Sequence, residues 1–177
     1  VSNYRRSLDL ETGTAHVTYD IGGVSHTREV FASYPDKVIV VRFSASDPGS
    51  VSINVGYNTP HSQNTVTALG NQLLLDAKVN RDADTRRQQV SDIEFQARVE
   101  VRAEGGSVTP QSSSISVENA DAVTLILHVA TNFVRFDDLS ADPDALASAA
   151  LVAVAIGLAG FWGFGPLRGS QSLTPLD

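Results

Sequence analysis

The sequence predicts an all-β domain built as an antiparallel β-sandwich. From Tyr4 to Thr131 the chain consists of short runs in which apolar and polar residues alternate, the pattern of strands with one buried and one solvated face. Turn residues separate these runs, and no helical period intervenes between them. A length of 177 residues, 42% of them hydrophobic, is enough for about one domain with a sizeable core.

About nine strands are expected in this region, each a period-two run or an apolar stretch between turn residues. They are predicted at 4–10, 15–19, 24–33, 38–43, 51–57, 73–79, 95–103, 114–117 and 122–131. Because short turns join neighbouring runs, we expect antiparallel hairpins.

The early strands are delimited by turns that contain glycine. Glu11–Thr14 joins the first two strands, and Gly22–Gly23 joins the second to the third. The strand at 38–43 has apolar residues on both faces, which is typical of a central strand covered on both sides. It is therefore predicted to be the centre of the core.

The later strands follow further turn signals. Asp47–Ser50 precedes the alternating strand at 51–57, and Gly105–Gly106 is predicted to be the turn of a late hairpin. The polar stretch from Asn80 to Asp92 interrupts the pattern. It is expected to form a long exposed loop and is a candidate lid.

The chain changes character after Asp142–Asp144, where Asp-Pro-Asp is expected to cap the start of a helix. Residues 145–167 carry no formal charge, so a buried helix, a membrane span and a gene-model artefact all stay open. Several glycines and Pro166 weaken the second half as a helix, which counts against a span. Two parts are expected: a β-sandwich at 1–143 and a helical, apolar linker or tail at 144–177.

Composition restricts the chemistry. A formal net charge of −7 without a cluster of Lys and Arg argues against a nucleic-acid partner. Because Cys is absent, disulfides, thiolate metal sites and Cys nucleophiles are excluded. No cofactor is expected. No secretory signal is visible at the start of the sequence given. No metal site is predicted, because the histidines are scattered and none form the His-x-x-x-His pair of a zinc site. They are His16, His26, His61 and His128.

Tyr57, Asn58 and His61 are the candidate substrate-binding residues. They lie in a turn after a strand, where an aromatic ring, an amide and an imidazole can stack on and hydrogen-bond to a sugar. A structural role for the same residues is the alternative.

No catalytic residue is assigned. A glycosidase needs paired carboxylates, but the acidic residues mostly fall on outward strand positions or in turns. A Gly-x-Ser-x-Gly motif is also missing. The spacing of the next four acidic residues lacks the Gly and Glu of an EF-hand, so helix capping is preferred over calcium binding. These residues are Asp137, Asp138, Asp142 and Asp144.

Three segments taken together resemble a known family. They are 4–10 (YRRSLDL), 23–33 (GVSHTREVFAS) and 36–45 (DKVIVVRFSA), with Ala130–Phe133 and Asp142–Pro143 also in matching places. Their order and spacing resemble the N-terminal β-domain of glycoside hydrolase family 95, which contains α-L-fucosidases and some α-galactosidases. The resemblance covers about residues 4–149.

The resemblance implies a supersandwich-like, non-catalytic N-terminal domain. In that family a helical linker and an (α/α)6 barrel follow, and a Glu acid and an Asn/Asp pair in the barrel carry out inverting hydrolysis. The implied partner is therefore a barrel absent from this chain, and fucosylated or related glycans bind through it. Secretion is implied too. Family members begin with further residues, so the first strands of the sandwich are expected to be missing here.

Two other functions stay open, and so does enzyme activity of the chain itself. A freestanding carbohydrate-binding module needs exposed rings, and those expected to be exposed are Tyr4, Tyr34 and Tyr57. The rings expected to be buried are Tyr19, Phe31, Phe43, Phe95 and Phe133. A membrane-anchored domain is disfavoured, because only Arg168 follows the apolar segment as a basic flank.

Overall fold

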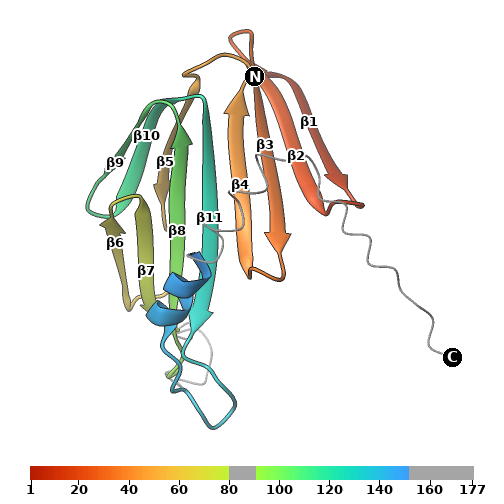
Figure 1. Cartoon of the computed structure of the whole chain (residues 1–177). Coiled ribbons are helices and arrows are strands. Elements are labelled where there is room, and N and C mark those ends of the chain that lie inside the picture. Colours follow the sequence, from red (N-terminus) through yellow and green to blue (C-terminus); the bar gives the residue numbers. More distant parts are fainter. Residues whose placement is uncertain (80–90, 152–177) are drawn as a thin grey trace, which may run out of the picture.

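The computed structural model describes residues 1–79 and 91–151. Within this part the chain forms eleven strands and a helical segment at 143–151, which confirms the predicted all-β class (Figure 1). The strands are β1 (Ser2–Asp9), β2 (Thr14–Ile21), β3 (Val24–Ser33), β4 (Val38–Ala45), β5 (Val51–Gly56), β6 (Asn64–Leu69), β7 (Gln72–Lys78), β8 (Glu94–Glu104), β9 (Ser107–Pro110), β10 (Ser114–Ala120) and β11 (Ala122–Thr131).

The strands form two antiparallel sheets. The long sheet has the order β1-β2-β3-β4-β11-β8-β7-β6, and the short sheet has the order β5-β10-β9. Leu125 of β11 lies opposite both Val41 of β4 and Val101 of β8, so one register runs across the centre of the long sheet. Alternate residues therefore share a face. We call the face toward the short sheet the inner face and the opposite one the outer face.

The main core lies between the short sheet and the β11, β8 and β7 part of the long sheet. Its largest side chains that are at most 1% exposed are Leu73, Val101, Ile115, Val117 and Val123. Burying an aliphatic side chain of this size stabilises the fold by about 1.5–3 kcal/mol. This cluster holds the two sheets together.

The prediction that 38–43 is the centre of the core is wrong. β4 is an inner strand of the long sheet, and on the outer face Val38 and Val40 are buried with Ile126 beneath Leu151 of the helical segment. On the inner face, however, Ile39 stays 43% exposed. The physical reason is that the short sheet does not extend over this part of the long sheet.

Over β1–β3 the long sheet extends beyond the short sheet, so the short sheet does not cover the inner face there (Figure 1). One row of this face, from Leu8 through Ala15 and Val30 to Val41, is apolar, whereas the next row carries Arg28 over the ring of Phe43. Leu8 is 60% exposed and its neighbours are only partly buried. Half of a sandwich core is thus present on the long sheet without a covering layer in the described part of the chain.

The predicted strands all occur, but two strands were missed. β6 was missed because polar residues at three of its six positions weaken the alternation, and β9 because it is only four residues long. The predicted hairpin at Gly105–Gly106 is wrong as well. β8 and β9 belong to different sheets, so these glycines, with φ of +69° and +66°, turn the chain from one sheet to the other.

The helical segment begins as predicted. Asp142 Oδ1 accepts hydrogen bonds from the backbone N–H groups of Asp144 at 3.0 Å and Ala145 at 3.2 Å, which makes Asp142 the N-cap. In the described residues no helix has the length and hydropathy needed to cross a bilayer. The expected loop at 80–90 and the tail from 152 onward lie outside the described residues.

Candidate functional site

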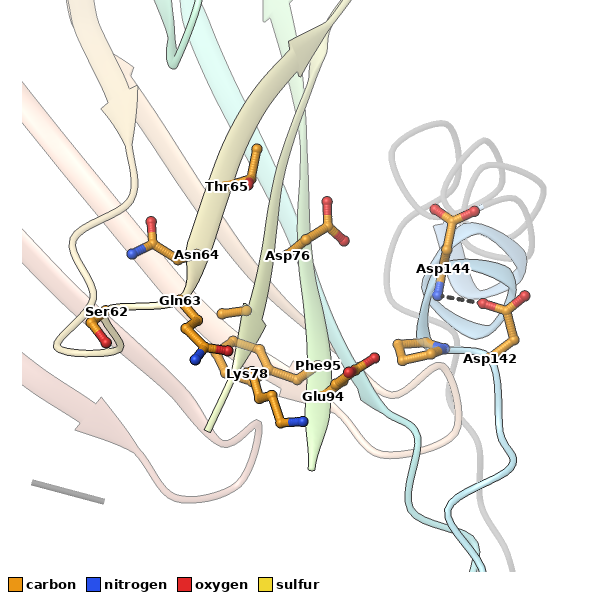
Figure 2. Close-up of a pocket in the computed structure, with 12 residues that line it drawn as sticks. Ser62, Gln63, Asn64, Thr65, Asp76, Lys78, Glu94, Phe95, Asp142 and Asp144 are labelled. Atoms are coloured by element: carbon orange, nitrogen blue, oxygen red, sulfur yellow. Dashed lines mark hydrogen bonds between the residues drawn. The ribbon is translucent and has the colours of Figure 1, made fainter. Parts of the chain in front are cut away.

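A cleft of about 530 Å³ lies at the end of the long sheet where β6 and β8 begin and β7 ends. The hydroxyl and amide groups of residues 62–65 form one wall, and the start of the helical segment, with Asp142 and Asp144, forms the other (Figure 2). Charged residues between the walls are Asp76, Lys78 and Glu94. The cleft is therefore polar at its rim.

The loop before β6 is held in place by its backbone. Asn64 Nδ2 donates to the carbonyl oxygen of His61 at 2.5 Å, and the backbone N–H of Lys78 donates to the carbonyl of Gln63 at 3.0 Å. The second bond ties the loop to the end of β7. The side chains of Ser62 and Gln63 line the cleft next to these bonds.

The other wall is fixed by a polar network on the outer face of β8. Gln96 and Arg98 are 3% and 7% exposed, and Arg98 Nε donates to Gln96 Oε1 at 3.1 Å. Gln96 Nε2 donates to Asp76 at 2.7 Å and to Asp144 at 3.0 Å, and the Arg98 guanidinium forms an ion pair with the same Asp144 carboxylate. This network attaches the start of the helical segment to the sheet.

Three of the four carboxylates that line the cleft act as acceptors within the fold. Asp142 caps the helix, whereas Asp76 and Asp144 accept from the Gln96 and Arg98 side chains. A glycosidase instead places one carboxylic acid opposite a second carboxylate, with the substrate between them. The described cleft offers hydrogen bonding to a polyhydroxylated ligand or to a polar protein surface.

None of the predicted residues Tyr57, Asn58 and His61 lines this cleft. The His61 ring meets the ring of Phe95, a cleft residue, edge-on with centroids 5.4 Å apart. Asn58 is exposed. The structure thus brings His61 next to the cleft, and substrate binding by the three residues stays a prediction.

Tyr57 is not the exposed ring that was expected. It packs against the buried cluster that contains Leu75 and Ala77, and its hydroxyl is buried without a hydrogen-bond partner among the described residues. Burial raises the pKa of Tyr57. The expectation of a buried Phe133 is also wrong, because that residue is 51% exposed.

The Gln96 and Arg98 network was missed by sequence reasoning, although a signal existed. Every second residue from Glu94 to Glu104 carries a charge or an amide. Such a stripe on one face of a long strand indicates a polar layer, and two of its members are buried here. The partner Asp144 lies 46 residues from Arg98 along the chain, so pattern reading did not connect them.

Metal binding gains no support from the described residues. In the ranges 1–79 and 91–151, no group of three or more His, Asp or Glu residues is placed to hold a metal ion. The Asp138 carboxylate instead accepts a hydrogen bond from the backbone N–H of Ser140 at 3.0 Å. Hydrogen bonds from the side chain and backbone of Ser140 lower the pKa of Asp138.

Residues 1–135 match the sequence model of the family described as glycosyl hydrolase family 65, N-terminal domain. "Alpha-L-fucosidase 2" of Arabidopsis thaliana is 35% identical over 147 residues, which are 75% of this chain and 17% of that protein. "Probable alpha-fucosidase A" of Aspergillus oryzae is 41% identical over 46 residues, which are 26% of this chain and 6% of that protein. Both names agree with the fucosidase resemblance of the sequence.

A solved structure with a similar fold is "Putative kojibiose phosphorylase from human microbiome". It superposes with a TM-score of 0.53 at 10% identity, covering 90% of this chain and 23% of that protein. At this identity the likeness concerns the fold alone. The chain spans less than a fifth of the length of the fucosidases that it matches.

Proposed function

The chain belongs to the family of glycosyl hydrolase family 65 N-terminal domains, and we propose that it serves as the non-catalytic N-terminal part of a carbohydrate-active hydrolase resembling α-L-fucosidases. In this proposal it packs against a catalytic (α/α)6 barrel that lies outside the 177 residues. We call the longer protein the parent protein. Fucosylated or related glycans bind through the barrel, and the parent protein is secreted.

The observation that carries this proposal is the docked helical segment at 143–151. Its first turn is tied to β8 through Asp144 and Arg98, and its last described residue, Leu151, is 2% exposed against the outer face of β4 and β11. The described part of the segment is thus attached to the sheet at both of its ends. Such a connection suits a division into a sandwich at 1–143 and a linker at 144–177 that leads to a second domain.

The uncovered inner face supports a partial sandwich. β5 is the edge strand of the short sheet, and a groove of about 340 Å³ separates it from the inner face at Tyr19, His26 and Phe43. An edge strand beside an apolar surface is a template for further strands. In our proposal strands from the remainder of the parent protein extend the short sheet over β1–β3.

The function is tested by assaying release of L-fucose from 2′-fucosyllactose. We expect the 177-residue chain to show neither turnover nor binding by calorimetric titration, whereas the parent protein releases fucose. Turnover by the chain alone would contradict the proposal. Binding without turnover would instead favour a freestanding carbohydrate-binding module.

We also propose that Asn58 and His61 border the glycan held by the barrel, whereas Tyr57, the third predicted residue, packs in the core. The edge-on contact of the His61 ring with the cleft residue Phe95 supports this role. In the parent protein, Asn58→Ala and His61→Ala should raise the KM for 2′-fucosyllactose and leave kcat nearly unchanged, as loss of uniform binding does. Thr109→Ala, on exposed β9, is the matched control. An unchanged KM in both variants would exclude the role.

A further inference from the structure

The loop between β11 and the helical segment, residues 132–141, presents apolar side chains to solvent. Phe136 is 92% exposed, and Phe133 and Val134 are each about half exposed, at 51% and 52%. We call residues 132–141 the aromatic loop. None of these three side chains belongs to the buried clusters of the described domain, so their exposure calls for a role outside it.

The aromatic loop is held in one conformation by its own hydrogen bonds. Arg135 and Asp138 form a two-residue bridge, with N–H to carbonyl distances of 3.1 and 3.0 Å. At the base of the loop, Asn132 is 9% exposed, and its side-chain amide donates to the carbonyl of Asp92 at 3.0 Å. The backbone N–H of Ala141 closes the loop on the carbonyl of Asn132 at 3.2 Å. The exposed rings are thus pre-organised.

The charged side chains of the loop interact with groups of the loop itself. Arg135 Nε lies 2.9 Å from Asp137 Oδ1, and the Asp138 carboxylate accepts from Ser140. Arg135 therefore already has an acidic partner, and a surface that buries Phe136 does not have to supply one. The side chains that the loop exposes most, Phe136, Phe133 and Val134, are apolar, which suits an apolar protein pocket.

The position of the loop identifies the partner. It ends directly at Asp142, where the helical segment begins, and it reaches beyond the strand ends on the side of the cleft (Figure 1). The chain covers 17% of the Arabidopsis fucosidase and 23% of the phosphorylase, so most of such a protein follows or precedes it. From these observations we propose that the aromatic loop inserts Phe136, with Phe133 and Val134, into an apolar pocket of the catalytic domain. This inference rests on the proposed function.

Hydroxyl-radical footprinting with mass spectrometry tests the contact. We expect the oxidation rate of Phe136 to be about tenfold lower in the parent protein than in the 177-residue chain, as for a ring at the centre of an interface. Leu69, 65% exposed on the β6–β7 turn, is the internal reference and should react equally in both. Equal oxidation of Phe136 in both proteins would overturn the inference.

The same experiment separates the two proposals. Leu146 of the helical segment is 49% exposed, and docking of a catalytic domain should protect it. Protection of Leu146 with a reactive Phe136 would keep the proposed function and refute the role of the loop. If Phe136 and Leu146 both stay reactive in the parent protein, the proposed function and the role of the loop are both refuted. Protection of Phe136 in the chain alone, either with added 2′-fucosyllactose or at raised protein concentration, would assign the loop to a glycan or to a second copy instead.

A substitution gives an independent test. Phe136→Ser should lower the thermal midpoint of the parent protein and leave that of the 177-residue chain unchanged, because the ring has no contact in the chain's own core clusters. Leu69→Ser, the matched control, should change neither midpoint. An unchanged parent midpoint for Phe136→Ser would contradict the inference.

Discussion

Tyr57 shows at the scale of one residue how a predicted binding group became part of the core. Its hydroxyl is buried without a partner in the described structure, which is an unfavourable arrangement. Tyr57→Phe removes the hydroxyl and keeps the ring, so we expect the free energy of unfolding in urea to rise by about 1 kcal/mol. Tyr34→Phe, at a residue 92% exposed, should have no effect. A loss of stability in Tyr57→Phe would mean that the hydroxyl has a partner.

The same residue predicts a pH dependence. Burial raises the pKa of Tyr57 above its ordinary value of 10.0, so above pH 10 the folded chain binds more protons than the unfolded chain. The free energy of unfolding is therefore unaffected by this group below pH 10 and decreases as the pH rises further, because the unfolded chain loses the phenol proton first. Urea unfolding at pH 9 and pH 11 should show a smaller decrease in Tyr57→Phe than in the wild type. Equal decreases would contradict the burial effect.

At the scale of the elements, the corners between the two sheets are the most constrained positions. Gly106 has φ of +66°, and a Cβ there would overlap the carbonyl oxygen of Glu118 and lie 2.7 Å from Ala120 N. Gly22, in the β2–β3 hairpin, has φ of +60° with open space around it. Both positions require the left-handed conformation, but only the corner also requires a close approach between backbones.

These two glycines form a matched pair for mutation. Gly22→Ala should cost about 1 kcal/mol of unfolding free energy, the penalty of a left-handed alanine. Gly106→Ala should cost about 3 kcal/mol or more, because the backbone of the corner must shift as well. Urea denaturation measures both, and equal costs would show that the corner relaxes without strain.

The attachment of the helical segment is the second test at the element scale. Asp144→Asn removes the charge that pairs with buried Arg98, and we expect a loss of about 2–3 kcal/mol or local release of the helix. Hydrogen exchange should become faster at 143–151 and stay unchanged in β2. Asp137→Asn, at an exposed ion pair with Arg135, is the control and should change stability by less than about 1 kcal/mol. Unchanged exchange in Asp144→Asn would show that the pair does not hold the helix.

For the whole molecule, the decisive feature is the apolar inner face that the short sheet leaves uncovered. Ile39 and Val129, on this face, are 43% and 52% exposed. The 177-residue chain should therefore bind an apolar fluorescent dye, and Ile39→Thr with Val129→Thr should lower the signal to roughly half. Leu69→Thr, at an exposed residue away from this face, is the control. Equal dye binding by all variants would locate the dye elsewhere.

The sequence pattern was sufficient to predict those features that depend on interactions between residues close together in the chain. The alternation of β2 and β3, the glycine turn between them and the Asp142 cap were all readable from the sequence, because each depends on residues a few positions apart. β6 escaped because its polar residues obscure the period. The fucosidase resemblance came from the order and spacing of whole segments and is confirmed by the relatives.

The sequence by itself therefore determined the all-β class, most of the strands and the family resemblance. Only the tertiary structure decided that Gly105–Gly106 is a corner between sheets, that the short sheet leaves the inner face uncovered over β1–β3, and that Asp144 meets Arg98 at the cleft. The physical reason is that sheet order and burial depend on pairing between distant segments. β11, for example, pairs with β4 across about eighty residues, and the local period of a strand does not specify its partner.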